Sequence, residues 1–71
     1  ANKDLVVMSL KSFVNDKLEW DAFLEEMDDM IRVEHTKIEV STDLVDLYRS
    51  QGAITVLRRL KYLRDKINGT K

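Results

Sequence analysis

The chain has no cysteine, no proline, only two glycines and only five aromatic residues among 71. Without cysteine, neither a disulfide nor a thiolate metal site can stabilise the fold. So few turn-forming residues argue against an all-β chain, in which every strand needs a turn. A chain of this length holds one domain at most and lies near the size at which a single hydrophobic core is marginal. Stability must therefore come from regular helix packing or from a second chain.

Long apolar runs are also missing. The longest, residues 5–8 (LVVM), is far shorter than the roughly 18 residues that span a bilayer, and too short for the core of a signal peptide. The 35% content of charged residues favours a soluble protein, while the 44% apolar content argues against simple disorder. We therefore expect no membrane partner, and the cysteine-free composition favours the cytoplasm.

Acidic and basic residues are concentrated in different parts of the chain. Residues 1–46 hold twelve acids against five bases, a net charge of −7, whereas residues 47–71 hold seven bases against one acid, a net charge of +6. Such a chain can fold its acidic part onto its basic part, or offer each part to a partner of opposite sign. The sequence does not decide between these two outcomes.

Nine positions at alternating spacings of three and four run from Leu10 to Ile38, and seven of them are apolar. This spacing predicts a long amphipathic helix over residues 10–40 with a coiled-coil-like seam. A second apolar row, which includes Met30 and Val33, widens the apolar face beyond a narrow seam. The polar face of this helix carries an acidic cluster formed by Glu19, Asp21, Glu25, Glu26, Asp28 and Asp29.

A second helix is predicted over residues 41–68. Ser41 or Thr42 can cap its start, and Gly69 ends it. Gly52 lies in its interior and indicates a close helix crossing, a local bend or a simply tolerated glycine. The short connection near residue 41 makes the two helices an antiparallel hairpin, so the predicted fold class is all-α.

Two helices alone make a poor core, so we expect the hairpin to self-associate through its apolar stripes. Residues 1–9 extend the first helix, form a short helix that covers the hairpin, or dock on another subunit, and their pattern does not separate these options. The residues predicted to form the interface with a protein partner are Trp20, Leu24, Met27, Ile31, Leu57, Leu60 and Leu63.

The sequence offers little for catalysis. There is a single histidine, the serines have no evident base, and no glycine-rich phosphate loop is present. His35 and Glu39 are four residues apart and can face one ion, but a metal site needs three or four ligands. The acidic cluster is better explained as a solvated face than as catalytic carboxylates. We therefore expect no enzyme activity, no cofactor and no bound metal.

A basic face near the end of the second helix is formed by Arg58, Arg59 and Lys66. Such a face can follow the phosphates of a nucleic acid. The net charge of −1 and a helix of acids argue against that partner, and favour a solvated face partly paired with acids across the hairpin. We predict no duplex binding at a physiological ionic strength of about 0.15 M.

Residues 48–52 (YRSQG) lead into residues 57–60 (LRRL), and residues 20–23 (WDAF) precede them on the acidic helix. This pattern resembles small helical-hairpin proteins encoded by tailed bacteriophages, and the similarity covers about residues 13–68. The resemblance implies a structural or accessory role in the virion or its assembly, located in the virion or the host cytoplasm, without catalysis. The resemblance assigns no functional-site residues to this chain.

The leading hypothesis is therefore a non-enzymatic interaction or assembly protein, with itself, a phage protein or a host protein as its partner. An alternative is an acidic regulator, which would use its acidic cluster to imitate DNA and bind a host protein that handles nucleic acids. A nucleic-acid-binding helical module comes third.

Overall fold

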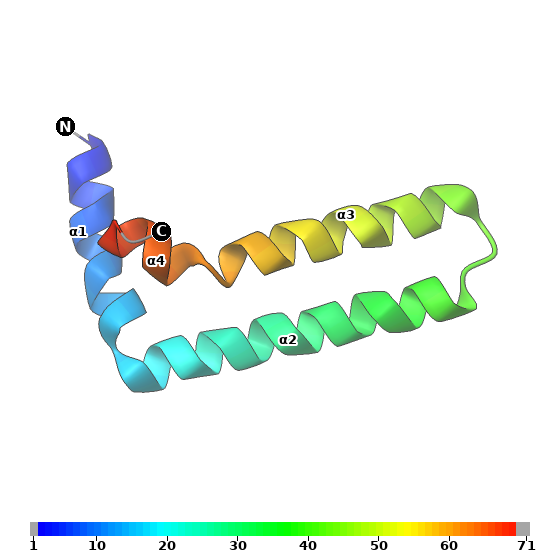
Figure 1. Ribbon diagram of the computed structural model, residues 1–71, viewed down its shortest axis with the longest axis horizontal. Helices are drawn as coiled ribbons and strands as arrows, with labels where there is room; N and C mark the ends of the chain where they lie inside the picture. The colour runs from blue at the N-terminus through cyan, green and yellow to red at the C-terminus, as the bar shows by residue number, and fades with distance from the viewer. Residues whose placement is uncertain (1, 70–71) are drawn as a thin grey trace.

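The computed structural model describes residues 2–69, and helices make up nearly all of this part (Figure 1). Helix α1 spans Asn2–Asn15, α2 spans Lys17–Val40, α3 spans Leu44–Leu60 and α4 spans Leu63–Asn68. No strand occurs within residues 2–69, and α2 lies antiparallel beside α3. The predicted all-α class and the helical hairpin are confirmed.

The start of the helix predicted over residues 10–40 is wrong. The helical conformation is interrupted at Asp16, so that two helices, α1 and α2, occupy this part of the chain. Asp16 has an extended backbone, and its carboxylate accepts a hydrogen bond of 2.9 Å from the Glu19 amide. This N-cap satisfies an amide that the first turn of α2 would otherwise leave without a partner. Residues 2–9 of the predicted segment 1–9 consequently belong to a separate helix, α1, which continues to Asn15, and residue 1 lies outside the described residues.

The connection between α2 and α3 also differs from the prediction. Asp43, rather than Ser41 or Thr42, caps α3, since its carboxylate accepts a hydrogen bond of 2.8 Å from the Val45 amide. Ser41 instead ends α2, and its hydroxyl lies within hydrogen-bond distance of the Asp43 backbone. A carboxylate at the cap also interacts favourably with the positive end of the α3 dipole.

The second helix predicted over residues 41–68 is interrupted by a turn at Lys61 and Tyr62. The turn separates α4 from α3 and places α4 against α1. Gly69 ends α4 as predicted, in the left-handed conformation with φ of 76°. The close crossing considered at Gly52 is wrong, because a Cβ there would meet no atom within 4 Å.

The core is concentrated where α1, α2 and α4 meet. Trp20 is 1% exposed, and its ring stacks on Phe23 at 5.1 Å and meets the edge of Phe13 at 5.9 Å. The Arg64 guanidinium of α4 lies 5.8 Å from the Trp20 ring centre, within the range of a cation–π contact. Val14 of α1 is fully buried. The Trp20 side chain, in the first turn of α2, is therefore enclosed with the help of helices from both ends of the chain, whereas Leu18 beside it is 82% exposed.

An amide pair joins the ends of α1 and α4. The Asn15 amide donates to the Asn68 side-chain oxygen at 3.0 Å, and the Asn68 amide donates back at 2.8 Å.

In Figure 1, α1 crosses one end of the hairpin and does not lie over α2 or α3 along most of their length. The molecule measures 45 × 27 × 19 Å, and its radius of gyration is 15.1 Å, against about 11 Å for a compact domain of this length. The hairpin consequently projects from a small enclosed core.

Candidate protein-interaction surface

One side of the projecting hairpin is an apolar surface, which we call the open face. Val33 of α2 and Val56 of α3 line a hollow of about 470 Å³ on this side, and a second hollow of about 450 Å³ continues from Val56 past Leu60. Val33, Val56 and Leu60 are 53%, 54% and 38% exposed. The open face comprises Met30, Val33, Ala53, Val56, Leu57 and Leu60.

Helix geometry explains why this face stays uncovered. Met27 of α2 and Ile54 of α3 are buried in the hairpin. Met30 and Leu57 each follow those residues by three positions and therefore lie on the flank of their helix, beside the contact rather than within it. Because α2 and α3 have apolar stripes wider than a single helix contact, the flanking residues remain open to solvent on one side.

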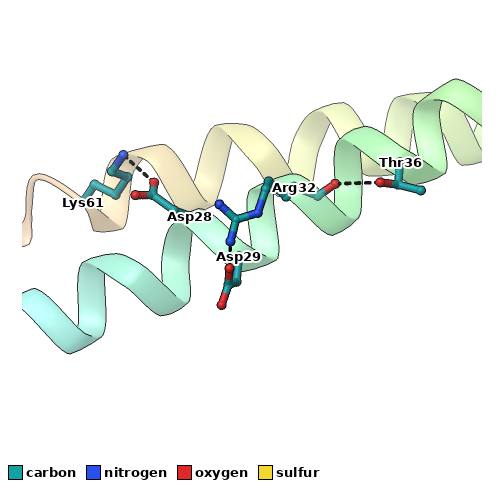
Figure 2. Close-up of polar contacts among 5 residues, drawn as sticks. All are labelled: Asp28, Asp29, Arg32, Thr36 and Lys61. Atoms are coloured by element: carbon teal, nitrogen blue, oxygen red, sulfur yellow. Dashed lines mark hydrogen bonds and ion pairs between the residues drawn. The ribbon is translucent and has the colours of Figure 1, made fainter.

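The other side of the hairpin is polar. Lys61, in the turn that follows α3, binds the Asp28 carboxylate of α2 at 2.7 Å (Figure 2). On α2, Asp29 forms an ion pair with Arg32, and the Thr36 hydroxyl donates to the Arg32 carbonyl oxygen at 3.1 Å. The hairpin is therefore asymmetric, with hydrogen bonds and an inter-helix ion pair on one side and apolar side chains on the other.

The structure divides the residues predicted to form the interface. Trp20 and Met27 are buried within the chain, so in this conformation they cannot reach a partner, and their assignment to the interface is corrected. Leu57 and Leu60 belong to the open face. Of the remaining predicted residues, Leu63 lines the 450 Å³ hollow together with Leu60, while Leu24 and Ile31 are half-buried.

Sequence reasoning missed four members of the open face, namely Met30, Val33, Ala53 and Val56. Met30 and Val33 were visible as the second apolar row of the first helix. The spacing showed that two rows exist, but it did not show which row faces α3 and which faces solvent. Ala53 and Val56 were likewise visible in an apolar row of the second helix that includes Leu57 and Leu60, but the row did not show which of its residues face α2.

The predicted basic face divides between two hollows that meet at Tyr62. Arg58 lines one hollow with Lys61, while Arg59 and Lys66 line the other, at the end of the open face. Between residues 2 and 69, the ion pair that joins α2 to α3 is Lys61 with Asp28. The predicted pairing of acids and bases across the hairpin therefore occurs, but through Lys61 rather than through the three residues of the predicted face.

The predicted acidic cluster is partly neutralised by bases of the same chain. Asp21 binds Lys17 at 2.9 Å, Asp29 pairs with Arg32, and Asp28 pairs with Lys61. Glu19, Glu25 and Glu26 are exposed. Half of the six carboxylates thus have a cationic partner within the chain, which weakens the negative field that the cluster presents.

A polar contact lies at the loop end of the open face. Glu34, which lines the 470 Å³ hollow, accepts a hydrogen bond of 3.1 Å from the Lys37 ammonium group. The Lys37 contact and the Ser50 hydroxyl hold the pKa of Glu34 below its usual value of 4.5, although desolvation opposes them. Glu34 therefore stays ionised at neutral pH, at the border of the apolar surface.

Among residues 2–69, no cluster of three or more His, Asp or Glu side chains is placed to hold a metal ion. His35 and Glu39 are both exposed on α2. No helix in this range is both long and apolar enough to cross a bilayer. Comparisons of the chain with protein-family models, curated proteins and solved structures found no significant match.

Proposed function

We propose that the protein is a non-enzymatic interaction or assembly protein that binds a protein partner through its open face. The observation that supports this most directly is the contrast between the two sides of the hairpin. A contiguous apolar surface with a polar border is the usual character of a protein-binding site. The resemblance to small phage proteins favours an accessory role in the virion or its assembly.

The exposed area of the chain agrees with an uncovered interface. The chain exposes 5778 Å² for a mass of 8.3 kDa. A compact monomer of that mass exposes about 4,600 Å², so the excess is about 1,200 Å². A partner in a standard protein complex buries about 800 Å² of its own surface. The excess reflects the elongated shape of the chain as a whole, in which the hairpin leaves much of its surface uncovered.

The acidic-regulator alternative has less support. It needs a strongly negative surface, but half of the acidic cluster is paired with lysine or arginine of the same chain. The open face also has no place in a mechanism that relies on charge alone. Partner binding through apolar burial accounts for both features.

Site-specific photo-crosslinking tests the proposal. A photoreactive phenylalanine derivative is introduced at Val56 on the open face, and separately at Gln51, an exposed residue of the same helix, as the matched control. In bacteria that express the chain, we expect a defined protein adduct from position 56 and none from position 51. Adducts of equal yield from both positions, or none from either, would contradict the proposal.

A further inference from the structure

The hollow of about 450 Å³ at the junction of α3 and α4 combines apolar and cationic side chains, and we call it the basic hollow. It is lined by Val56, Arg59, Leu60, Tyr62, Leu63 and Lys66. The aliphatic side chains provide an apolar surface, and Arg59 and Lys66 add positive charge beside it. No acid is among the lining residues. A partner that fills the basic hollow must therefore be apolar where it meets the aliphatic side chains and negatively charged where it meets the two bases.

The two bases of the basic hollow are available to a partner. No ion pair within residues 2–69 includes Arg59 or Lys66, and both side chains are exposed. Lys61 of the adjoining turn differs, because it binds the Asp28 carboxylate at 2.7 Å. Asp65, the acid of α4, does not line the basic hollow. The basic hollow thus presents two positive charges that no carboxylate of residues 2–69 pairs with.

The rest of the open face supplies no acid to balance these charges. The hollow of about 470 Å³ shares Val56 with the basic hollow, and Glu34 is the one charged residue that lines it. The Glu34 carboxylate already binds the Lys37 ammonium group at 3.1 Å. The uncompensated charge along the two hollows is therefore positive and lies at the α4 end. A second open face would bring further cations and no unpaired acid, so it does not complement the first.

The helical fold also determines the form of the partner. Residues 2–69 contain no strand, so an extended segment bound here would find no sheet edge for its backbone groups. An amphipathic helix satisfies its backbone hydrogen bonds internally and presents side chains at spacings of three and four on one face. Such a helix can place an apolar stripe along the two hollows, which are continuous through Val56.

We infer that the open face binds an acidic amphipathic helix of another protein, whose Asp or Glu side chains pair with Arg59 and Lys66 while its apolar stripe fills the hollows. This inference rests on the proposed function and names the class of partner. Carboxylates form strong, charge-assisted hydrogen bonds with guanidinium and ammonium groups, and the Tyr62 hydroxyl can donate another. Apolar burial supplies the affinity, and the charges select acidic helices over neutral or basic ones.

The first experiment selects peptides on the immobilised full chain. The library contains random peptides of about 16 residues, which are long enough for roughly four helical turns. We expect the enriched peptides to carry apolar residues at spacings of three and four together with two or more acids. Enrichment of neutral or basic peptides, or no enrichment, overturns the inference.

The second experiment tests the charges with the most strongly enriched peptide. Arg59→Gln combined with Lys66→Gln should raise its Kd about tenfold at low ionic strength and less at high salt. Arg49→Gln combined with Arg58→Gln removes the same charge from two residues that line other hollows, and should change the Kd less than about twofold. Equal weakening by the two double variants shows a response to net charge alone and overturns the inference.

The third experiment tests the apolar contact with the same peptide. Val56 and Val45 both lie on α3 and are both 54% exposed, but only Val56 lines the hollows of the open face. We expect Val56→Ser to weaken binding severalfold and Val45→Ser to leave it unchanged, with circular dichroism confirming that both variants keep their helices. Equal effects of the two substitutions place the peptide elsewhere and overturn the inference.

The last experiment tests other occupants of the open face. The purified chain with the photoreactive residue at position 56 should give no crosslinked dimer, and a single-stranded thymidine oligonucleotide of about 16 nucleotides should not bind. A dimer shows that a second copy covers the face, and oligonucleotide binding that Arg59→Gln with Lys66→Gln abolishes shows a phosphate site. Either result overturns the inference. The proposed function still stands if position 56 crosslinks to a protein in cells, and falls if it gives no adduct there.

Discussion

The two ends of the hairpin differ in how many helices meet there. At the end near α1, helices α1 and α4 contact each other and α1 contacts α2, and Val14 and Trp20 are almost completely buried. At the loop end only α2 and α3 meet, and Leu44, Val45 and Tyr48 are more than half exposed. The sequence has similar apolar patterning at both ends, so burial depends on the number of neighbouring helices rather than on the pattern alone.

This difference separates an enclosed end from an uncovered surface within one short chain. The enclosed end gathers the three packed aromatic rings and the cation–π contact. The hairpin that projects from it leaves the open face exposed, which is the surface that we propose for a partner. Substitutions at the two ends should therefore have unequal effects on the isolated chain, and the predictions below test that inequality.

The largest effect is expected for Trp20→Ala. Removal of a fully buried indole leaves a cavity beneath α1 and α4, and should lower the free energy of unfolding by about 3–5 kcal/mol. A domain of this size has only about 4–10 kcal/mol in total, so the variant should be largely unfolded at modest urea concentrations. Urea denaturation followed by circular dichroism measures the loss. Leu44→Ala at the loop end is the control, with an expected change of less than about 0.5 kcal/mol. Equal losses would show that the loop end is also a closed core.

The next largest effects are expected for two glycine-to-alanine substitutions, one of which should stabilise the fold and the other destabilise it. Gly52→Ala replaces an exposed helical glycine with open space around it, and should stabilise the chain by about 0.5–1 kcal/mol. Gly69→Ala places a Cβ at a φ of 76°, and should destabilise it by about 1 kcal/mol. Thermal unfolding of the two variants in parallel provides the comparison. Destabilisation by Gly52→Ala would mean that a second chain approaches α3 at this position.

A smaller effect is expected for Asp28→Asn, which removes the charge that binds Lys61. Both side chains are partly exposed, so the loss should be about 0–1 kcal/mol and should shrink further as salt is added. Urea denaturation at low and at high ionic strength measures both the loss of stability and its dependence on salt. A loss that is larger, and indifferent to salt, would indicate that this ion pair determines the register of α2 against α3.

The smallest and most specific effect concerns pH at the loop end. Because the pKa of folded Glu34 lies below its usual value of 4.5, the contacts of its carboxylate stabilise the fold above that pH, and their contribution is lost as the pH falls through the lowered value. Ser50→Ala removes one of these contacts. The stability difference between Ser50→Ala and the unmodified chain should therefore be larger at pH 7 than at pH 3. A difference that does not change with pH would show that Ser50 contributes by packing alone.

The helical period and the scarcity of glycine and proline were enough to predict the all-α hairpin and its end at Gly69. The break at Asp16 was not predictable, because an N-cap aspartate looks like any other acid until its backbone conformation is known. The break at Lys61 and Tyr62 has no glycine or proline to mark it, and accompanies the packing of α4 on α1. Contacts between residues so far apart in sequence leave no local signal.

For the candidate site, the sequence revealed two apolar rows on α2 but not their orientation. Trp20 and Met27 were expected at an interface and are buried, while Met30 and Val33 are on the open face. A residue of either row can face a neighbouring helix or solvent. The choice depends on how α3 packs on α2 and, for Trp20, on how α1 and α4 pack, which is a property of the whole fold.

The amide pair between Asn15 and Asn68 also has a consequence for the order of folding. It joins residues 53 positions apart, whereas α2 and α3 are connected by a short loop. Contacts between neighbouring segments generally form sooner than distant ones, so the hairpin can form early, and α1 docks fully only after α4 has been synthesised. At translation rates of about 5–20 residues per second, the interval is about 3–10 s. During that time α1 lacks its α4 neighbour and is open to chaperones on the nascent chain.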